Sequence, residues 1–488
     1  MEAQFSILHI SDLHRISDND IDCLISSFQL EKEEYRKQGI PSVKLIIVSG
    51  DIINGSNQKE VSLAKAEITK QYDVALRFLV ELTGVFLGKK DEDRLNVIIV
   101  PGNHDMSRYV SLASMEAIDN DNIDKLVSAL WSNNSIIRWS WKDLQFHEIK
   151  DKETYDHRFD DFIEFYNSFY KGQRLFPTDV DAQSALIDIP ELNMAVACFN
   201  SCYQLDHLRT SGYISPRSLS SLTKSLIEAK NNGRLIVAIW HHHTHGLPNE
   251  NNYLDYTILD NMTQSGICLA FHGHQHVSGI VNEHKDVFSD SKLTMVSAGT
   301  LYGNSRDIPT GLTRQYNILK VDMREEKCVF TLISRQDRTA LNQMPAWECG
   351  NIGRSKNDSY TFEIEMPPKI QGTSEDDLQR EINRINLFIE KTGDFKSGIQ
   401  KLESLDVNNV LVRKILLDLL LRVNDFQSIL KYFSVPQSVV EAIAVIDICI
   451  KTRNADMFKF VLNTKYVQKT VDPSLAAMIE EAKMIINK

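Results

Sequence analysis

The sequence predicts a mixed α/β chain in which two sheets pack face to face between layers of helices, followed by an all-α C-terminal domain. The first observation is that short runs of Val, Ile and Leu, each ending near Gly or Ser, alternate with segments of helical spacing through residue 340. The second is that residues 375–488 show helical spacing almost throughout. The length of 488 residues leaves room for two or three domains.

Three apolar runs open the chain and predict strands buried on both faces of a sheet. They are FSILHIS (5–11), KLIIVSG (44–50) and LNVIIVPG (95–102). The segments between them have helical spacing and are expected to end at Gly39 and Gly84. This order predicts parallel strands joined by crossover helices, because neighbouring parallel strands need a long connection.

Residues 106–182 interrupt this order with an aromatic-rich, mostly helical stretch, which we interpret as a helical insertion or a cap over the site. β-Rich runs then resume, together with one helix that begins at the capping residue Ser215 and ends at Gly233. The strands predicted after the insertion cover residues 185–189, 193–200, 234–240, 267–273, 293–299, 316–322 and 327–334. So many strands favour two packed sheets with helices on their outer faces.

The sequence changes character after residue 340. Residues 341–374 carry Gly, Pro and Ser and predict a linker with one exposed strand, YTFEIEM (360–366). Residues 375–488 predict stacked helical hairpins that serve as an interaction or dimerisation domain. The helices are expected at 377–391, 408–423, 438–451, 455–463 and 473–487.

Composition narrows the classes of protein to consider. No stretch approaches the ~18 uninterrupted apolar residues of a membrane-spanning helix, and the N-terminus lacks a secretory pattern, so we expect a cytoplasmic protein without a membrane segment. Seven cysteines without a CxxC pair indicate reduced thiols. A net charge of -12 disfavours tight nucleic-acid binding but leaves open a local basic patch, for which the Lys- and Arg-bearing stretch 376–425 is the candidate.

Five short polar motifs follow predicted strands: SDLH, SGDIIN, PGNHD, WHHHTHG and GHQH. Open α/β sheets bind their ligands at the carboxyl ends of strands. Asp12 and His14 stand two positions apart and can address one cation from the same side. Asp51 has two carboxylate oxygens and can bridge two cations. Taken singly, each motif is also compatible with a turn, a helix cap or a hydrogen-bonded core histidine.

The other motifs add neutral side chains that can bind a metal ion or transfer a proton. Asn103 offers an amide oxygen and His104 can donate a proton to a leaving oxygen. His274 and His276 share a side and can address two neighbouring metals. Of the four histidines in WHHHTHG, His241 comes first after the strand and is the expected ligand.

The other histidines of that motif receive less definite expectations. His242 points the other way by strand alternation and is expected behind the ligands or facing substrate. His243 and His245 are loop residues that touch either substrate or only water.

In this order, DxH, GD, GNHD, H and GHxH, the motifs resemble the signature of the calcineurin-like metallophosphoesterase superfamily over about residues 5–335. The stretches VSGD, VPGNHD, GYISPRSLSSLTKSL, WHHH, GHQH and VSAGT look most like its class III cyclic-nucleotide phosphodiesterase branch. SDLH and GNHD also occur in the nuclease members. Where members of the phosphodiesterase branch often have HHP, this chain has HHHTHG, which puts the local loop shape and the substrate fit in question.

The resemblance implies an α/β/β/α metallophosphoesterase sandwich and a site for two divalent metal ions. One ion would be held by Asp12, His14 and His276, the other by Asn103, His241 and His274, and Asp51 would bridge them. His104 would contact phosphate and act as general acid. Asn103 would also face substrate, and weaker candidates for substrate contact are Arg15, Asn54 and His242.

The implied reaction is hydrolysis of a phosphodiester, from a nucleotide or another small diester, by attack of metal-bound hydroxide. A ligand set of nitrogen and oxygen suits Mn, Fe, Zn, Co or Ni. Two alternatives stay open, a metal-dependent nuclease of the same superfamily and a non-catalytic scaffold. The C-terminal helices would bind a protein partner or self-associate, and nucleic acid is a further possible partner.

Overall fold

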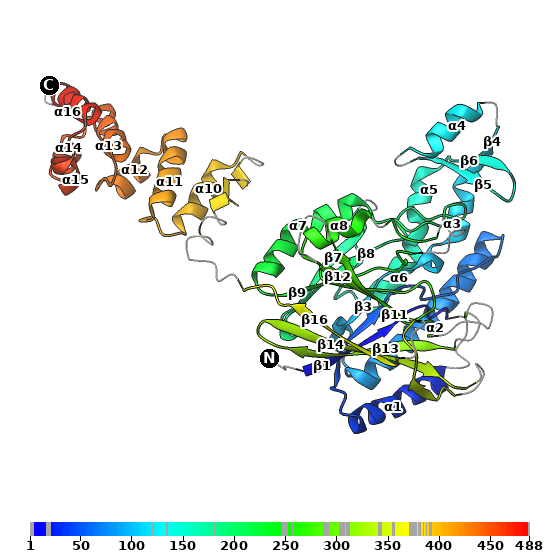
Figure 1. Ribbon diagram of the computed structural model, residues 1–488. Helices are drawn as coiled ribbons and strands as arrows, with labels where there is room; N and C mark the ends of the chain where they lie inside the picture. The colour runs from blue at the N-terminus through cyan, green and yellow to red at the C-terminus, as the bar shows by residue number, and fades with distance from the viewer. Residues whose placement is uncertain are drawn as a thin grey trace. The chain divides into compact units, whose positions relative to one another are not determined.

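Two β-sheets lie face to face in the first of two units, Met1–Ile370, of the computed structural model (Figure 1). The second unit is Gln371–Lys488, and each has its own hydrophobic core. The structure describes residues 4–15, 21–119, 122–132, 135–179, 182–245, 252–255, 257–285, 292–301, 308, 313–339, 344–353, 357–369, 378, 382–383, 385–386, 388–389 and 393–486.

The first sheet has the strand order β15-β14-β13-β1-β2-β3, with β16 also paired to β14. Its strands are β1 (Gln4–Ile10), β2 (Val43–Val48), β3 (Val97–Ile99), β13 (Gln315–Met323), β14 (Lys327–Asp337), β15 (Trp347–Cys349) and β16 (Ser359–Glu365). β1, β2 and β3 run parallel, with Ile10 opposite Val48 and Ile46 opposite Val97, as the sequence predicted. The remaining strands pair antiparallel.

The second sheet has the order β11-β12-β10-β9-β8-β7. Its strands are β7 (Ser184–Ile189), β8 (Met194–Phe199), β9 (Leu235–Ile239), β10 (Leu269–His272), β11 (Gly279–Lys285) and β12 (Lys292–Ser297). The four central strands are parallel, and the edge strands β7 and β11 are antiparallel to their neighbours. The carboxyl ends of β9 and β10 therefore meet at one edge.

Side chains alternate between the two faces of each sheet, and this alternation builds the layers. In the first sheet Ile7 and Ile47 face the other sheet, whereas Ile10 and Ile46 face the helices. The outer face is covered by α1 (Ile21–Lys37), α2 (Val61–Phe86) and α6 (Asp160–Phe169). The second sheet is covered by α7 (Pro216–Asn231) and α8 (Thr257–Gln264). The predicted α/β/β/α sandwich is confirmed.

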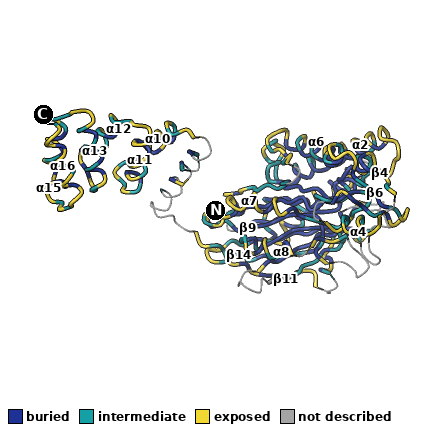
Figure 2. Tube along the Cα trace, turned by 90° about the horizontal axis from the view of Figure 1, so that it is seen from above, coloured by how far each residue is buried: buried dark blue, intermediate teal, exposed yellow. Residues whose placement is uncertain are grey.

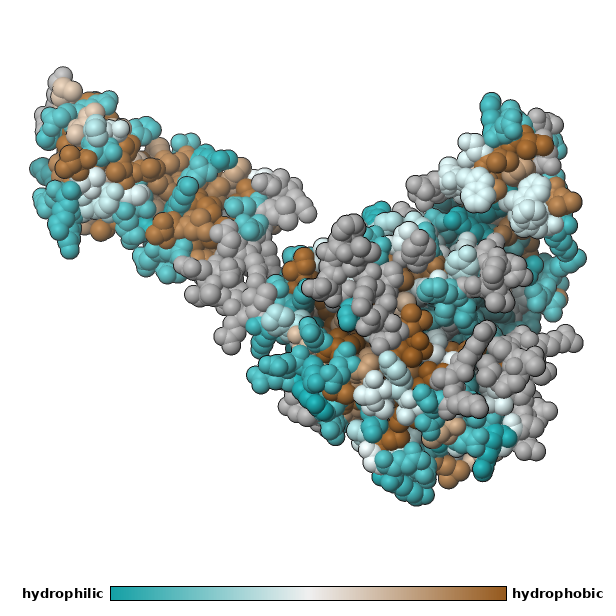
Figure 3. Space-filling view, viewed as in Figure 1, coloured by the Kyte–Doolittle hydropathy of each residue, from teal (hydrophilic) through white to brown (hydrophobic). Residues whose placement is uncertain are grey.

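Residues 106–182 contain the expected helices and also strands that the sequence did not predict. The helices before α6 are α3 (Arg108–Ala113), α4 (Ile123–Leu130) and α5 (Lys152–Asp156). A small antiparallel sheet, β4-β6-β5, is formed by Met115–Ile118, Gln145–Ile149 and Ile137–Ser140. α6 packs into the core beneath the first sheet. Near α4, Ile123 and Trp131 are exposed, and Figure 3 shows hydrophobic surface in this part of the molecule.

The range expected to be a linker, 341–374, contributes two strands to the first sheet. β15 and β16 both pair with β14, and the first compact unit reaches Ile370. The reason is that Phe362 and Ile364, two positions apart, are both buried in the core between the sheets. Residues 341–343, 354–356 and 370–374 lie outside the described residues.

The described residues of the second unit form helices joined by short connections. Its helices are α10 (Phe395–Glu403), α11 (Val410–Arg422), α12 (Phe426–Phe433), α13 (Val439–Thr452), α14 (Ala455–Leu462), α15 (Lys465–Lys469) and α16 (Pro473–Ile486). Five of them begin at a capping side chain that accepts a backbone N–H: Asp394, Asn409, Asp425, Ser438 and Asn454.

The helix predicted at 377–391 lies largely outside the described residues, and its described positions are helical. In the helices that follow, buried and exposed positions alternate along the chain (Figure 2), and apolar residues at the buried positions form the core of this unit. None of the described helices combines the length and the apolar composition that crossing a membrane requires.

Candidate metal centre

The candidate site lies where the carboxyl ends of parallel strands from both sheets meet. Asp12, Asp51 and Asn103 follow β1, β2 and β3 of the first sheet, and His241 and the GHQH motif follow β9 and β10 of the second. Backbone contacts tie the two edges together. Ser11 pairs with Thr300, and the imidazole Nδ1 of His241 lies 2.7 Å from the carbonyl oxygen of Ser49.

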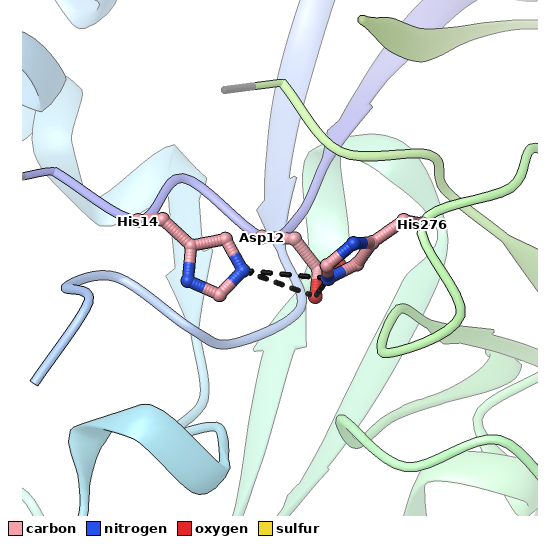
Figure 4. A group of neighbouring side chains, drawn as sticks. All are labelled: Asp12, His14 and His276. Carbon is pink, nitrogen blue, oxygen red and sulfur yellow. Dashed lines mark hydrogen bonds and ion pairs between the residues drawn. The ribbon is translucent and has the colours of Figure 1, made fainter. Parts of the chain in front are cut away.

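One group of side chains consists of Asp12, His14 and His276 (Figure 4). His276 Nε2 lies 3.1 Å from Asp12 Oδ1, and His14 Nε2 lies 3.4 Å from His276 Nε2 and 3.9 Å from Asp12 Oδ1. In Figure 4 the His14 ring faces the Asp12 carboxylate and the His276 ring. Nitrogen and oxygen atoms from two segments, SDLH and GHQH, therefore lie close together.

A second group gathers around the side-chain oxygen of Asn103. His241 Nε2 lies 3.0 Å and His274 Nδ1 lies 2.9 Å from Asn103 Oδ1. All three residues were expected to share one metal ion, and the structure brings their donor atoms together.

Asp51 lies between the two groups. Its Oδ2 is 3.3 Å from His241 Nε2 and 3.9 Å from His14 Nε2, so one oxygen atom faces a histidine of each group. Its other oxygen accepts the backbone N–H of His104 at 2.8 Å. One carboxylate oxygen of Asp51 thus faces both groups, and the other fixes the backbone at His104.

The backbone is strained at most of these residues. Asp12, His14, Asp51, His274 and His276 all have positive φ angles, between 43° and 75°. An L residue in this region costs roughly 1–2 kcal/mol, and such strain clusters at functional sites. Five of the ten described non-glycine residues with positive φ are therefore expected metal ligands, which indicates that the fold holds these side chains in place for a purpose.

Two motif glycines allow close approach of the segments. A Cβ atom on Gly102 would overlap the backbone and carboxylate of Asp51, and one on Gly273 would overlap the Ser11 hydroxyl and lie 2.5 Å from Asp12 Oδ2. The GNHD and GHQH turns can therefore rest directly on the two aspartates only because these positions have no side chain.

His104 lies beside the first group, and its hydrogen bond indicates which ring nitrogen carries the proton. Its Nδ1 lies 2.8 Å from the carbonyl oxygen of Asn54, and a carbonyl can only accept, so Nδ1 carries a proton. The Nε2 atom is then the one that can gain or release a proton. The His104 ring lies edge-on to the ring of His14, with centroids 4.7 Å apart.

Asp105 is a positioning residue that the sequence analysis did not single out. It is 1% exposed and accepts hydrogen bonds from the backbone N–H groups of Gly102 at 2.8 Å and Ile52 at 3.1 Å, and from the Tyr72 hydroxyl at 3.2 Å. Asp105 thereby joins the loop of Asp51 to the loop of Asn103. The clue in the sequence was its place as the last residue of PGNHD, which is equally common in ordinary turns.

The electrostatics leave the carboxylates ionised and two of the imidazoles neutral. Burial would raise the pKa of Asp12, but His276 outweighs burial and holds it below its usual value. Burial also opposes ionisation of Asp51, yet His241 and His104 hold its pKa well below the usual range. Burial lowers the pKa of His14 and of His274 to about 4. Neutral imidazoles and ionised carboxylates are the forms that bind metal ions.

His241 differs from the other histidines. Burial alone would lower its pKa, but the charge of Asp51 raises it to about 9. Because Nδ1 donates to the Ser49 carbonyl, Nε2 is the atom directed at Asp51 and Asn103. A ring nitrogen fixed by a backbone carbonyl is the usual support of a metal-binding histidine.

The weaker candidates occupy different surroundings. Arg15 is buried, not on the surface; its guanidinium lies over the Phe78 ring at 5.4 Å, and its Nε donates to the Leu13 carbonyl oxygen. Asn54 contacts His104 through its backbone oxygen. A direct contact of either residue with substrate stays a prediction.

His242 is fully buried behind the second group. Its ring centroid lies 4.8 Å from that of His274, and its Nδ1 lies 2.9 Å from the Ser201 hydroxyl. Ser201 also accepts the backbone N–H groups of His241 and His242. His242 therefore supports the ligands from behind. His243 and His245 lie in the loop beyond it, where His243 Nδ1 accepts the His245 N–H at 2.8 Å.

The donor set fits divalent cations. Three groups of His and Asp side chains place their ligand atoms within 4.8 Å of one another, and Asp51 belongs to two of them. The members are largely buried, and without a cation several of their acceptor atoms face one another. A bound cation would reduce the electrostatic repulsion between these acceptor atoms.

A family model describes the same part of the chain. The model of the calcineurin-like phosphoesterases matches residues 5–278, which include all seven expected ligands. The chain belongs to the calcineurin-like phosphoesterase family. Membership implies a metal-dependent hydrolase of phosphoesters, and it agrees with the groups of side chains that could hold a metal ion in this calcineurin-like phosphoesterase.

Similarity to solved structures is distant. A dimetal phosphatase from Danio rerio is 13% identical with a TM-score of 0.37, covering 67% of this chain and 95% of its own. The calcineurin-like phosphoesterase YfkN from Bacillus subtilis is 12% identical with a TM-score of 0.27, covering 80% and 98%. GAP50 of Plasmodium is 11% identical with a TM-score of 0.33, covering 77% and 93%.

At TM-scores this low, these similarities carry no weight for fold or function, and the family assignment rests on the family model. No curated protein matches this calcineurin-like phosphoesterase significantly.

Proposed function

We propose that the chain is a phosphodiesterase that acts on a nucleotide or another small phosphodiester with the help of two divalent cations. The observation that carries the proposal is the position of Asp51, whose Oδ2 lies within 4 Å of a histidine from each of two groups of donor atoms. A carboxylate in that position can bind two cations at once.

Each cation has its own set of residues in this proposal. Asp12, His14 and His276 would hold one cation, Asn103, His241 and His274 would hold the other, and Asp51 would contact both. When bound, such a pair of cations makes water acidic enough to act as a nucleophile near neutral pH and offsets the charge of the phosphoryl oxygens. Mn, Fe, Zn, Co and Ni are all compatible with these ligands.

His104 supplies the proton in this proposal. The Asn54 carbonyl fixes the orientation of the ring and leaves Nε2 to exchange protons with the leaving oxygen of the substrate. The backbone N–H of His104 binds Asp51, which ties the proton donor to the centre of the site. Asp105 holds the loop that carries Asn103 and His104 against the loop of Asp51.

A diester substrate is supported by the motifs that resemble the class III cyclic-nucleotide phosphodiesterase branch, above all WHHH and GHQH. The loop around His243 and His245 departs from that branch and borders the site, so it is the place where substrate choice would differ. A substrate panel of cyclic nucleotides, phosphomonoesters and nucleic acids would test the class of substrate directly.

The decisive experiment compares two aspartate variants of the full chain. With Mn²⁺, the wild type is expected to hydrolyse bis(p-nitrophenyl) phosphate faster than p-nitrophenyl phosphate, and Asp51→Asn is expected to lose this activity. Asp73→Asn makes the same chemical change at an exposed position of α2 and is expected to keep it. An inactive wild type, or an Asp51→Asn variant as active as wild type, would contradict the proposal.

Two experiments on the same purified protein distinguish the phosphodiesterase from the two alternatives, a nuclease and a non-catalytic scaffold. Cleavage of labelled single- or double-stranded DNA with Mn²⁺, without turnover of small diesters, would favour the nuclease. Absence of bindable metal by elemental analysis would favour the scaffold.

We further propose that residues 375–488 bind a partner or self-associate, and that the protein works in the cytoplasm. Sizing the full chain against a chain ending near residue 370, and cell fractionation, test these two points.

A further inference from the structure

The solvent side of α14 and α15 forms a basic face, defined here by Arg453, Lys459, Phe460, Lys465 and Lys469. All five side chains are exposed, and Phe460 keeps 51% of its surface in contact with solvent. Residues 451–469 hold five basic side chains and one acidic one, in a chain whose net charge is -12. The local charge is therefore opposite in sign to the net charge of the chain.

Helical spacing places these side chains on one side of each helix. In α14, Phe458 and Val461 are buried in the core of the second unit, so Lys459 and Phe460 point outward. The one acidic residue of the stretch, Asp456, shares that outer side at three and four positions before them.

The next helix also exposes basic side chains. In α15, Val467 is buried, and Lys465 and Lys469 stand four positions apart on the outer side. α14 and α15 are consecutive and contact each other, and Figure 1 shows them side by side near the C-terminus. Arg453 precedes α14 at the end of α13.

The cations of the basic face are not neutralised by the protein. Within the described residues, none of the four makes an ion pair. The sequence had pointed instead to residues 376–425, but that stretch holds eight basic and nine acidic residues. Two of its arginines are paired, Arg413 with Glu441 and Arg422 with Asp418. The candidate basic patch therefore lies further along the chain than expected.

We propose that the basic face binds single-stranded nucleic acid. Four exposed cations on adjoining helices match the regular negative charge of a phosphate backbone. Phe460 follows Lys459 directly and offers an exposed ring on which an unpaired base can stack, which a duplex or an acidic peptide does not require. The single strand is therefore the polyanion that uses both features of the face.

The expected salt dependence follows from the number of cations. If all four contact phosphate, the logarithm of the binding constant falls with the logarithm of salt concentration with a slope of about -2.8 for a single strand. Raising salt from 50 to 200 mM would then weaken binding about 50-fold. Loss of two cations would bring the slope to about -1.4.

The test measures fluorescence anisotropy of a labelled 20-nucleotide single strand with the full chain in EDTA, where hydrolysis by the proposed metal site cannot contribute. Lys459→Glu/Lys465→Glu is expected to weaken binding at least tenfold and to halve the salt slope. Lys396→Glu/Lys414→Glu reverses two exposed charges elsewhere in the same unit and is expected to bind as wild type. Phe460→Ala is expected to weaken binding about tenfold without changing the slope.

The proposal is overturned by absence of binding, by equal loss in both double variants, or by tighter binding of a poly-glutamate peptide or a duplex than of the single strand. Circular dichroism of every variant shows that the helices are intact. Because binding is measured without metal, it can succeed where the phosphodiesterase proposal fails, and it can fail where that proposal succeeds.

Discussion

Replacing Asp105 by Asn should loosen the site without removing any residue proposed to bind metal. The Asp105 carboxylate only accepts hydrogen bonds, and its donors are backbone N–H groups and the Tyr72 hydroxyl. An amide group has one acceptor oxygen and one NH₂ group. Placing NH₂ at Oδ2 turns a donor toward the N–H groups of Gly102 and Ile52.

The magnitude follows from these contacts. A hydrogen bond to a charged group contributes about 1.5–3 kcal/mol, and one or two would be lost. Removal of a buried charge offsets part of this loss. We therefore expect the free energy of unfolding to fall by about 2 kcal/mol. The comparison belongs at pH 8, well above the ordinary pKa of a carboxyl group.

The assay is urea unfolding followed by tryptophan fluorescence, because all five tryptophans lie in the first unit. The turnover of bis(p-nitrophenyl) phosphate should fall as well, since Asp105 positions the loop of Asn103 and His104. Asp73→Asn, at an exposed position, serves as control. A change below about 0.5 kcal/mol together with unchanged turnover would refute the role of Asp105, because that is the range of ordinary surface substitutions.

Three further predictions concern the same unit. His104→Asn should lower kcat about 100-fold or more for an alkyl leaving group and much less for p-nitrophenolate, which needs no proton; equal losses for both would contradict a proton-donor role. Gly273→Ala should abolish Mn²⁺ binding measured by calorimetry, because the new Cβ overlaps Ser11 and crowds Asp12; retained affinity would contradict the close packing of the GHQH turn. Burial holds the pKa of His207 at about 4, so the folded state binds fewer protons, and stability should be complete above about pH 6.5 and decline as the pH falls toward 4. At pH 5, the His207→Gln variant should lose about 1 kcal/mol less free energy of unfolding than the wild type; this value is reduced because His207 is partly exposed. Identical pH profiles of unfolding for the two proteins would contradict the prediction.

The strands and the layers could be predicted because buried parallel strands are encoded locally, as uninterrupted apolar runs such as KLIIV before Ser49. Boundaries were less accurate. Gly84 was expected to end a helix, yet α2 continues to Phe86 because the apolar side chains beyond it still pack into the core. β4, β5 and β6 were missed because they are four or five residues long and carry polar residues among the apolar ones.

The grouping of the expected ligands could be predicted because each motif ends a parallel strand, and such ends share an edge of the sheet. The contributions of Asp105 and Ser201 could not, because a buried polar residue reveals its partners only after distant segments have come together. The burial of Arg15 is another example, since its neighbour Phe78 lies on α2. A strand was expected at 360–366, but as an exposed strand of a linker, because Pro and Gly around it concealed that Phe362 and Ile364 alternate toward the core.

Anomalous diffraction at the manganese edge, from crystals of the full chain grown with Mn²⁺, tests the central claim most directly. We predict two anomalous peaks roughly 3.5–4 Å apart, one on each side of Asp51 Oδ2, with Asp12, His14 and His276 around one and Asn103, His241 and His274 around the other. A single peak, or a pair of peaks that Asp51 does not contact, would contradict the claim that this aspartate joins two metal sites.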